Sequence, residues 1–302
     1  MNTNPYLSKL GFSSTDRVAI IHADDIGMCQ ATLPAIADLL DFGLVTSAAV
    51  MVPCPWFQGA AQYAREHPGV DFGVHLTLNS EWDTYRWGPV STRESASGLL
   101  DEQGHFFNNT EATQERADTV AVRLELDTQL AIAKSAGITP THADTHMFCL
   151  GHARFFPLYV QAALDAGTFP LAVPPGSRAW LLFFGDEEIG DGYIPEMAKI
   201  AAELAERNVP MVDDICWMNL ETHENRLDEA KGLFDALQPG FTHFILHPSV
   251  DTPELRAIAP DWRCRVADYE TFMSQELKDH INNKGVQLIG YGELLKAMVT
   301  TN

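Results

Sequence analysis

Short apolar segments alternate with longer amphipathic segments along most of the chain. The short segments are rich in Val, Ile, Leu and Phe over about four to eight residues, which is typical of strands buried on both faces. Eight segments have this pattern: Arg17 to His22, Val45 to Val52, Val70 to Leu78, Thr139 to His146, Phe169 to Val173, Met211 to Trp217, Thr242 to His247 and Val286 to Gly290.

The longer segments carry apolar residues at spacings of three and four, the period of an amphipathic helix. They are Ala31 to Phe42, Phe57 to Glu66, Glu111 to Ala136, Arg154 to Ala166, Glu196 to Glu206, Glu224 to Leu237 and Val266 to Asn283. Strands that alternate with helices predict an α/β fold with a parallel sheet. We therefore expect one barrel-like (β/α) domain over residues 1–302, with a long loop insertion near residues 80–109.

The charge of the chain narrows the classes of partner. It has 41 acidic and 20 basic residues, a net charge of −21, and 46% hydrophobic residues. An acidic chain without clusters of Lys and Arg is a poor match for nucleic acid or for an anionic membrane. Because no segment has the pattern of a signal peptide or membrane helix, we expect a soluble, cytoplasmic protein. Five scattered cysteines predict reduced thiols that are mostly buried.

Candidate chemistry gathers where predicted strands end, which is where parallel barrels build their active sites. The first strand runs directly into two adjacent carboxylates, Asp24 and Asp25. Neighbouring side chains on an extended backbone point to opposite sides, so the two acids are expected to have different roles, one with a metal and one with a proton. The alternative is that one of them caps the following helix.

Histidines lie in or at the ends of three further predicted strands. His75 lies in an apolar strand, where a histidine is also compatible with a purely structural role. His142, Asp144 and His146 alternate and would share one face of a strand. The two histidines would then be about 13 Å apart, too far to bind the same ion, and His146 is nearer the carboxyl end. His247 ends another strand, a position that suits general acid or base catalysis.

One carboxylate and two imidazoles from different strand ends match a metal site that keeps positions open for water. Zinc suits this ligand set, whereas magnesium prefers oxygen ligands. Aromatic side chains can contact the apolar faces of a sugar ring. The candidates for substrate binding are Trp82, Trp87, Trp262 and the neighbouring Arg263.

Five motifs together resemble the YdjC-like carbohydrate deacetylases, a family that includes chitooligosaccharide deacetylases. They are His22-Ala23-Asp24-Asp25-Ile26-Gly27, Gly43-Leu44-Val45-Thr46-Ser47, Gly73-Val74-His75-Leu76, Thr141-His142-Ala143-Asp144-Thr145-His146 and His247-Pro248. The resemblance extends from about residue 17 to residue 295. It implies a distorted, TIM-like (β/α) barrel and a metal-dependent hydrolase that removes the N-acetyl group from an amino sugar or short oligosaccharide.

The resemblance also implies roles for individual residues. Asp25, His75 and His146 would hold one divalent ion, zinc or magnesium. Asp24 would be the general base and His247 the general acid. The chain departs from the family pattern at His22, where Asn is usual, and at Met147, where a further His is frequent.

Two other functions are compatible with the sequence. A barrel metal phosphoesterase would use similar Asp and His ligands, but it should carry more cationic residues near the strand ends. A sugar-binding protein without catalysis would not need an open metal position. The expected partner is a small N-acetylated sugar, and the sequence leaves both a monomer and a homodimer open.

Overall fold

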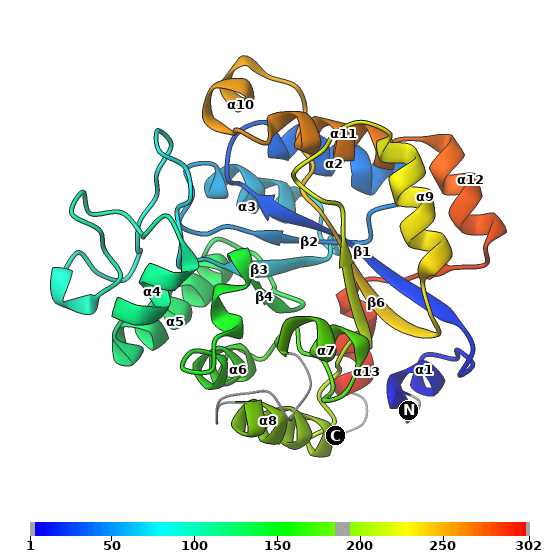
Figure 1. The fold of residues 1–302 in the computed structure, drawn as a ribbon, viewed down its shortest axis with the longest axis horizontal. Helices are drawn as coiled ribbons and strands as arrows, with labels where there is room; N and C mark the ends of the chain where they lie inside the picture. Colours follow the sequence, from blue (N-terminus) through cyan, green and yellow to red (C-terminus); the bar gives the residue numbers. More distant parts are fainter. Residues whose placement is uncertain (1–3, 185–193, 300–302) are drawn as a thin grey trace.

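The computed structural model describes residues 4–184 and 194–299. Its sheet contains seven parallel strands: β1 (Arg17–Ile26), β2 (Ser47–Val50), β3 (Phe72–Leu76), β4 (Ala143–Thr145), β5 (Asp214–Trp217), β6 (Gly240–Leu246) and β7 (Gln287–Leu288). The strand order is β4-β3-β2-β1-β6-β5, and β7 pairs with β1. The sheet curls into a half-barrel with helices around it (Figure 1), which confirms the predicted α/β class.

The helices of the described residues connect the strands and cover the sheet (Figure 1). They are α1 (Pro5–Lys9), α2 (Thr32–Phe42), α3 (Phe57–Glu66), α4 (Thr110–Arg116), α5 (Thr119–Ser135), α6 (Phe156–Asp165), α7 (Arg178–Phe184), α8 (Ile194–Glu206), α9 (Arg226–Ala236), α10 (Pro253–Ile258), α11 (Trp262–Phe272), α12 (Gln275–Asn283) and α13 (Tyr291–Val299), with 3₁₀ turns at Ser95–Ser97 and His146–Gly151. Among them, none combines the length and the apolar character that crossing a bilayer requires.

The strand predicted at residues 169–173 is absent, and this prediction was wrong. The segment makes one isolated parallel bridge, between Ala143 and Pro170. Phe169 O and Leu171 N make the bonds to Ala143, so the nitrogen of Pro170 faces away from β4 and has no N–H to donate to a strand on that side. Leu171 N still donates to Ala143 O at 2.7 Å, and Val212 N donates to Ala172 O at 3.0 Å. The segment therefore links the two edges of the half-barrel without forming a strand.

Two predicted helices are each divided in two, because a capping residue lies inside the predicted range. Asp118 accepts hydrogen bonds from two backbone N–H groups at the start of α5 and so separates α5 from α4. Ser274 caps α12 in the same way and separates it from α11. Asp and Ser side chains satisfy N–H groups that have no partner in the first helical turn. Such a cap can end one helix and begin the next.

The alternation of side chains along each strand separates the core from the site. On β6, Phe244 points outward and stacks on Phe234 of α9, with ring centroids 4.5 Å apart. His243, the preceding residue, points to the other face and contacts His22 of β1. The inner face of the sheet therefore carries polar and titratable groups. All five cysteines are free thiols, and four of them are buried, as predicted.

Candidate metal centre at the carboxyl ends of the strands

The pair of carboxylates at the end of β1 leaves the extended conformation at its second member. Asp25 has a backbone φ of 64°, in the left-handed region that Asp and Asn tolerate better than most residues. Its side chain meets Arg265, whose guanidinium donates to Asp25 Oδ2 at 2.7 Å. The other oxygen, Oδ1, lies 3.2 Å from His146 Nδ1 and 3.5 Å from His75 Nε2. The turn thus directs one carboxylate oxygen toward two imidazoles.

We call Asp25, His75 and His146 the outer cluster. Each residue offers one ligand atom, and these atoms all lie within 4.8 Å of one another. All three side chains are buried, and Asp25 Oδ1 has no hydrogen-bond donor within the structure that is described. A buried carboxylate oxygen without a donor is costly unless a cation meets it. This arrangement fits a divalent metal ion.

The remaining polar atoms of the outer cluster are held by other side chains. His75 Nδ1 lies 2.9 Å from Asp144 Oδ1, and His146 Nε2 lies 2.9 Å from Glu81 Oε2. Metal-binding histidines usually donate their second N–H to a carboxylate, which fixes the tautomer and the ring orientation. Both histidines have this partner, so their other ring nitrogens are the ones available to a cation.

Electrostatics in the outer cluster favour positive charge. Burial opposes the charged form of Asp25, but Arg265 and His146 hold the pKa of its carboxyl well below the ordinary value. Burial also disfavours the charged form of His75, yet Asp144 and Asp24 raise its pKa to about 9. For His146, Glu81 and Asp25 likewise outweigh burial and raise the pKa to about 10. The carboxylates around the two imidazoles thus create a negative potential that a bound cation would balance.

A second group of titratable side chains lies next to the outer cluster, and we call it the inner cluster. It consists of His22, Asp24, Asp144 and His243. Its candidate ligand atoms also lie within 4.8 Å of one another, and all four residues are buried. Here the residues already bond to one another or to neighbouring side chains. His22 Nδ1 lies 2.7 Å from Asp24 Oδ1, Asp144 Oδ1 is held by His75, and His243 Nδ1 lies 2.8 Å from Tyr291 Oη. Within the part of the chain that the structure describes, no group forms a hydrogen bond with His243 Nε2.

His247 follows β6 and faces the first carboxylate of the pair. Its Nε2 lies 3.9 Å from Asp24 Oδ2, and its backbone N–H donates to Asp268 Oδ2 at 3.0 Å. Burial lowers the pKa of His247, and the nearby carboxylates Asp25 and Asp24 oppose this only in part. The two side chains therefore face each other, at a separation beyond that of a direct hydrogen bond.

The side chains predicted to contact the substrate differ in their burial and in their distance from the outer cluster. Trp82 is buried, with the Arg265 guanidinium 5.3 Å from its ring centroid, so it supports the outer cluster from behind. Arg263 is exposed and stacks on the half-buried Trp262 at 4.4 Å. The arginine that reaches the site is Arg265, two positions later on α11.

Arg265 and Glu81 were missed as site residues by the sequence analysis. Arg265 lies 240 positions from Asp25 and on a helix rather than at a strand end. Glu81 lies in the segment after β3 that was expected to be an insertion. A signal for Arg265 exists in the sequence: Asp261 lies four positions earlier, and both of its carboxylate oxygens accept from Arg265 Nε at 3.0 Å.

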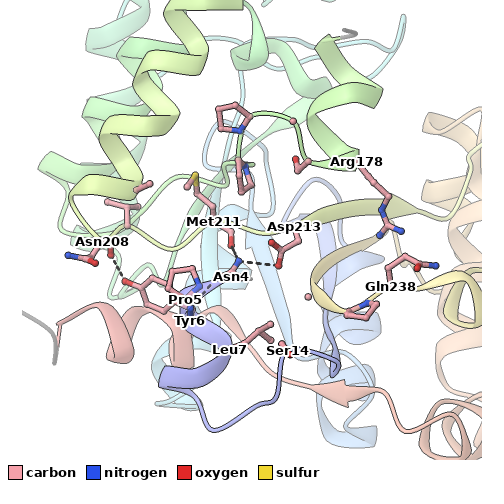
Figure 2. Close-up of a pocket in the computed structure, with 18 residues that line it drawn as sticks. Asn4, Pro5, Tyr6, Leu7, Ser14, Arg178, Asn208, Met211, Asp213 and Gln238 are labelled. Atoms are coloured by element: carbon pink, nitrogen blue, oxygen red, sulfur yellow. Dashed lines mark hydrogen bonds between the residues drawn. The ribbon is translucent and has the colours of Figure 1, made fainter. Parts of the chain in front are cut away.

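A cavity of about 760 Å³, whose lining is drawn in Figure 2, opens at the amino ends of β5 and β6. None of its described lining residues belongs to either cluster. Asn4 Nδ2 donates to Asp213 Oδ2 at 3.1 Å and to Met211 O at 2.9 Å. The charged residues in its described lining are Asp213 and Arg178, and Arg178 pairs with Asp214. This lining, as far as the structure describes it, includes no His or Cys. The clustered imidazoles and carboxylates thus lie at the opposite end of the strands.

Comparison with known proteins links this chain to one family. The family model described as "YdjC-like protein" matches residues 18–283. A carbohydrate deacetylase of Thermus thermophilus is 32% identical over 90% of this chain and 92% of its own length. A carbohydrate deacetylase of Enterococcus faecalis is 26% identical over 93% and 99%. The fold is shared with a crystal structure from E. faecalis assigned to cellobiose-phosphate cleavage, with a TM-score of 0.75 at 24% identity over 93% and 99% of the two chains.

Proposed function

Since the chain belongs to the YdjC-like family, we propose that it is a metal-dependent carbohydrate deacetylase. Its substrate is an N-acetylated amino sugar or short oligosaccharide, and the bond hydrolysed is the linear amide of the acetamido group. The observation that carries the metal dependence is Asp25 Oδ1, a buried carboxylate oxygen with no hydrogen-bond donor among the described residues. It faces two imidazoles whose second nitrogens are already held by carboxylates.

Asp25, His75 and His146 are the proposed ligands of one divalent ion. When bound, such an ion supplies Lewis-acid polarisation of the acetamide oxygen and lowers the pKa of a coordinated water. The donor set of one carboxylate and two imidazoles suits zinc, and it does not exclude magnesium. Arg265 and Glu81 act on these ligands: Arg265 fixes the orientation of Asp25, and Glu81 fixes that of His146.

Asp24 and His247 are the proposed proton carriers. Asp24 accepts a proton from the attacking water through Oδ2, the oxygen that faces His247. The C–N bond then breaks as its nitrogen receives a proton from His247 Nε2, giving an amine and acetate. Because burial lowers the pKa of His247, its proton has to be supplied during the reaction. Asp24 Oδ2 lies 3.9 Å from His247 Nε2, and the proton that Asp24 takes from the attacking water would pass to His247 through one bridging water or substrate group.

We propose that aromatic side chains at the carboxyl ends of the strands bind the sugar. Trp217 ends β5 with 42% of its surface exposed. It pairs in register with Ile245 of β6, which pairs with His22 of β1, so its side chain shares the inward face of the sheet with the inner cluster. An exposed indole there can stack on a pyranose ring next to Asp24 and His247. Trp262 and Arg263 are proposed for more distant contacts.

The decisive experiment measures acetate release from N-acetylated mono- and oligosaccharides, with and without a chelator. Release that stops with chelator and returns with zinc or magnesium would support the proposal. Phosphate release from an aryl phosphate, without acetate release, would favour the phosphoesterase. Sugar binding without either product would indicate a binding protein.

A further inference from the structure

A chain of hydrogen bonds runs from the proposed general base into the interior of the half-barrel. His22 Nδ1 lies 2.7 Å from Asp24 Oδ1, and His22 Nε2 lies 2.8 Å from His142 Nε2. His142 Nδ1 lies 3.0 Å from Thr141 Oγ1, which lies 2.6 Å from Asp71 Oδ1. All four distances are in the range of good hydrogen bonds. The chain therefore joins two carboxylates through two imidazoles and one hydroxyl.

Counting protons shows that this chain has a fixed direction. Each of the four links needs one proton, but two neutral imidazoles and one hydroxyl supply only three. One further proton must lie on Asp71, on an imidazole or on Asp24. Burial lowers the pKa of His142, which disfavours an imidazolium there, and burial raises the pKa of Asp71. With the fourth proton on Asp71, each group donates to the next one toward Asp24, so His22 Nδ1 is the donor and Asp24 Oδ1, 2.7 Å away, is the acceptor.

Packing holds the two imidazoles in this arrangement. His142 stacks on the ring of Tyr291, with centroids 4.0 Å apart. On its other side lies Gly73, where an added Cβ would come within 2.4 Å of the His142 ring. Glycine at this position of β3 leaves the space that the ring occupies. His22 has no exposed surface and contacts His142 edge-on. Neither ring can rotate without displacing its neighbours.

We propose that His22 is a positioning residue for the general base: its Nδ1–H holds Asp24 Oδ1, so that Oδ2 faces His247 and the substrate. His142, Thr141 and Asp71 maintain the protonated Nδ1 by ordering the chain behind it. This inference rests on the proposed function only for the catalytic role of Asp24. The hydrogen bond itself and the tautomer of His22 can be tested without turnover.

The kinetic test compares His22→Asn with His22→Leu. Asparagine can place an amide N–H where His Nδ1 lies, whereas leucine fills the space without a donor. We expect His22→Leu to lower kcat about 100-fold with KM and metal content unchanged, because a misplaced catalytic group costs about that much. His22→Asn should stay within about 5-fold of the native kcat. Equal losses in both variants, or a loss expressed in KM, would overturn the proposal.

The structural test uses ¹⁵N NMR of labelled histidines in the native protein and in Thr141→Val. The native spectrum should show His22 with a protonated Nδ1. Thr141→Val keeps the shape of the side chain but cuts the link between His142 and Asp71, so the resonances of both buried imidazoles should shift. An unprotonated His22 Nδ1 in the native protein, or spectra unaffected by Thr141→Val, contradicts the inference.

These readouts separate the two hypotheses. If the native protein releases no acetate but His22 Nδ1 is protonated and responds to Thr141→Val, the proposed function fails and the hydrogen-bond chain stands. If acetate is released but His22 Nδ1 carries no proton, the function stands and the positioning role fails.

Discussion

The outer and inner clusters contain the same residue types a few ångströms apart, yet their atoms are used differently. In the outer cluster, the second polar atom of each residue is held from outside by Asp144, Glu81 or Arg265, which leaves three atoms converging on one point. In the inner cluster, side chains bond to one another, as His22 does to Asp24. A metal site is thus recognised by the ligand atoms that other side chains leave available. Residue types alone do not distinguish the outer cluster from the inner cluster.

Charge separates the clusters further. Together they bury three carboxylates, Asp24, Asp25 and Asp144, and Asp25 is paired with Arg265. One divalent ion and Arg265 carry as much positive charge as these three carboxylates carry negative charge. A second divalent ion in the inner cluster would exceed the charge of these three carboxylates. We therefore expect one ion per chain, in the outer cluster.

The largest effect should come from Asp25→Asn, which removes the ligand charge of the outer cluster. Asparagine tolerates the left-handed backbone of this position, so loss of folding is not expected. Bound metal measured by elemental analysis should vanish, and acetate release should fall by at least about 10³-fold. Asp24→Asn is the matched control: it should keep the ion while turnover is lost. A stoichiometric ion in Asp25→Asn would mean that the outer cluster is not the metal site.

Arg265→Met should destabilise the metal-free protein by about 3–5 kcal/mol, because it leaves Asp25 as a buried charge without its partner. Urea unfolding in the presence of a chelator measures this loss. Added zinc should restore part of it, since the ion then balances Asp25. Arg263→Met, on the same helix but exposed, should cost less than about 1 kcal/mol. Equal losses in both variants would show that the Arg265 contact with Asp25 is not important.

Asp144→Asn should weaken metal binding by about 10- to 100-fold, because it changes the partner that orients His75. Isothermal titration calorimetry with zinc measures the affinity. Glu81→Gln should behave similarly through His146. If neither variant alters the affinity, the carboxylates behind the histidines do not tune the site.

His243→Leu should leave metal stoichiometry unchanged, in contrast to every change in the outer cluster. It should cost about 1–3 kcal/mol in unfolding free energy, because the buried Tyr291 hydroxyl loses its partner at 2.8 Å. The double variant with Tyr291→Phe should recover part of that loss. A lower metal content in His243→Leu would instead indicate that the inner cluster holds an ion.

The sequence predicted the order of strands and helices better than the residues at which they begin and end. Apolar runs located the seven strands, because burial on both faces leaves a continuous apolar signal. The eighth prediction failed at Pro170, where one missing N–H prevented a ladder that the apolar pattern favoured. The predicted helix limits were wrong at Asp118 and Ser274. The apolar periodicity continued across each of these residues, whereas their hydrogen bonds to backbone N–H groups begin a new helix.

By itself, the sequence determined that Asp24, Asp25, His75, His146 and His247 follow or lie in strands, and a parallel sheet brings such residues to one end. Which atoms meet depends on how distant segments pack together. The register between strands and the packing of α11 bring Arg265 to Asp25 across 240 positions and set His22 against His142. Periodicity along one strand fixes the face of a side chain, whereas its partners depend on elements that the local sequence does not contain.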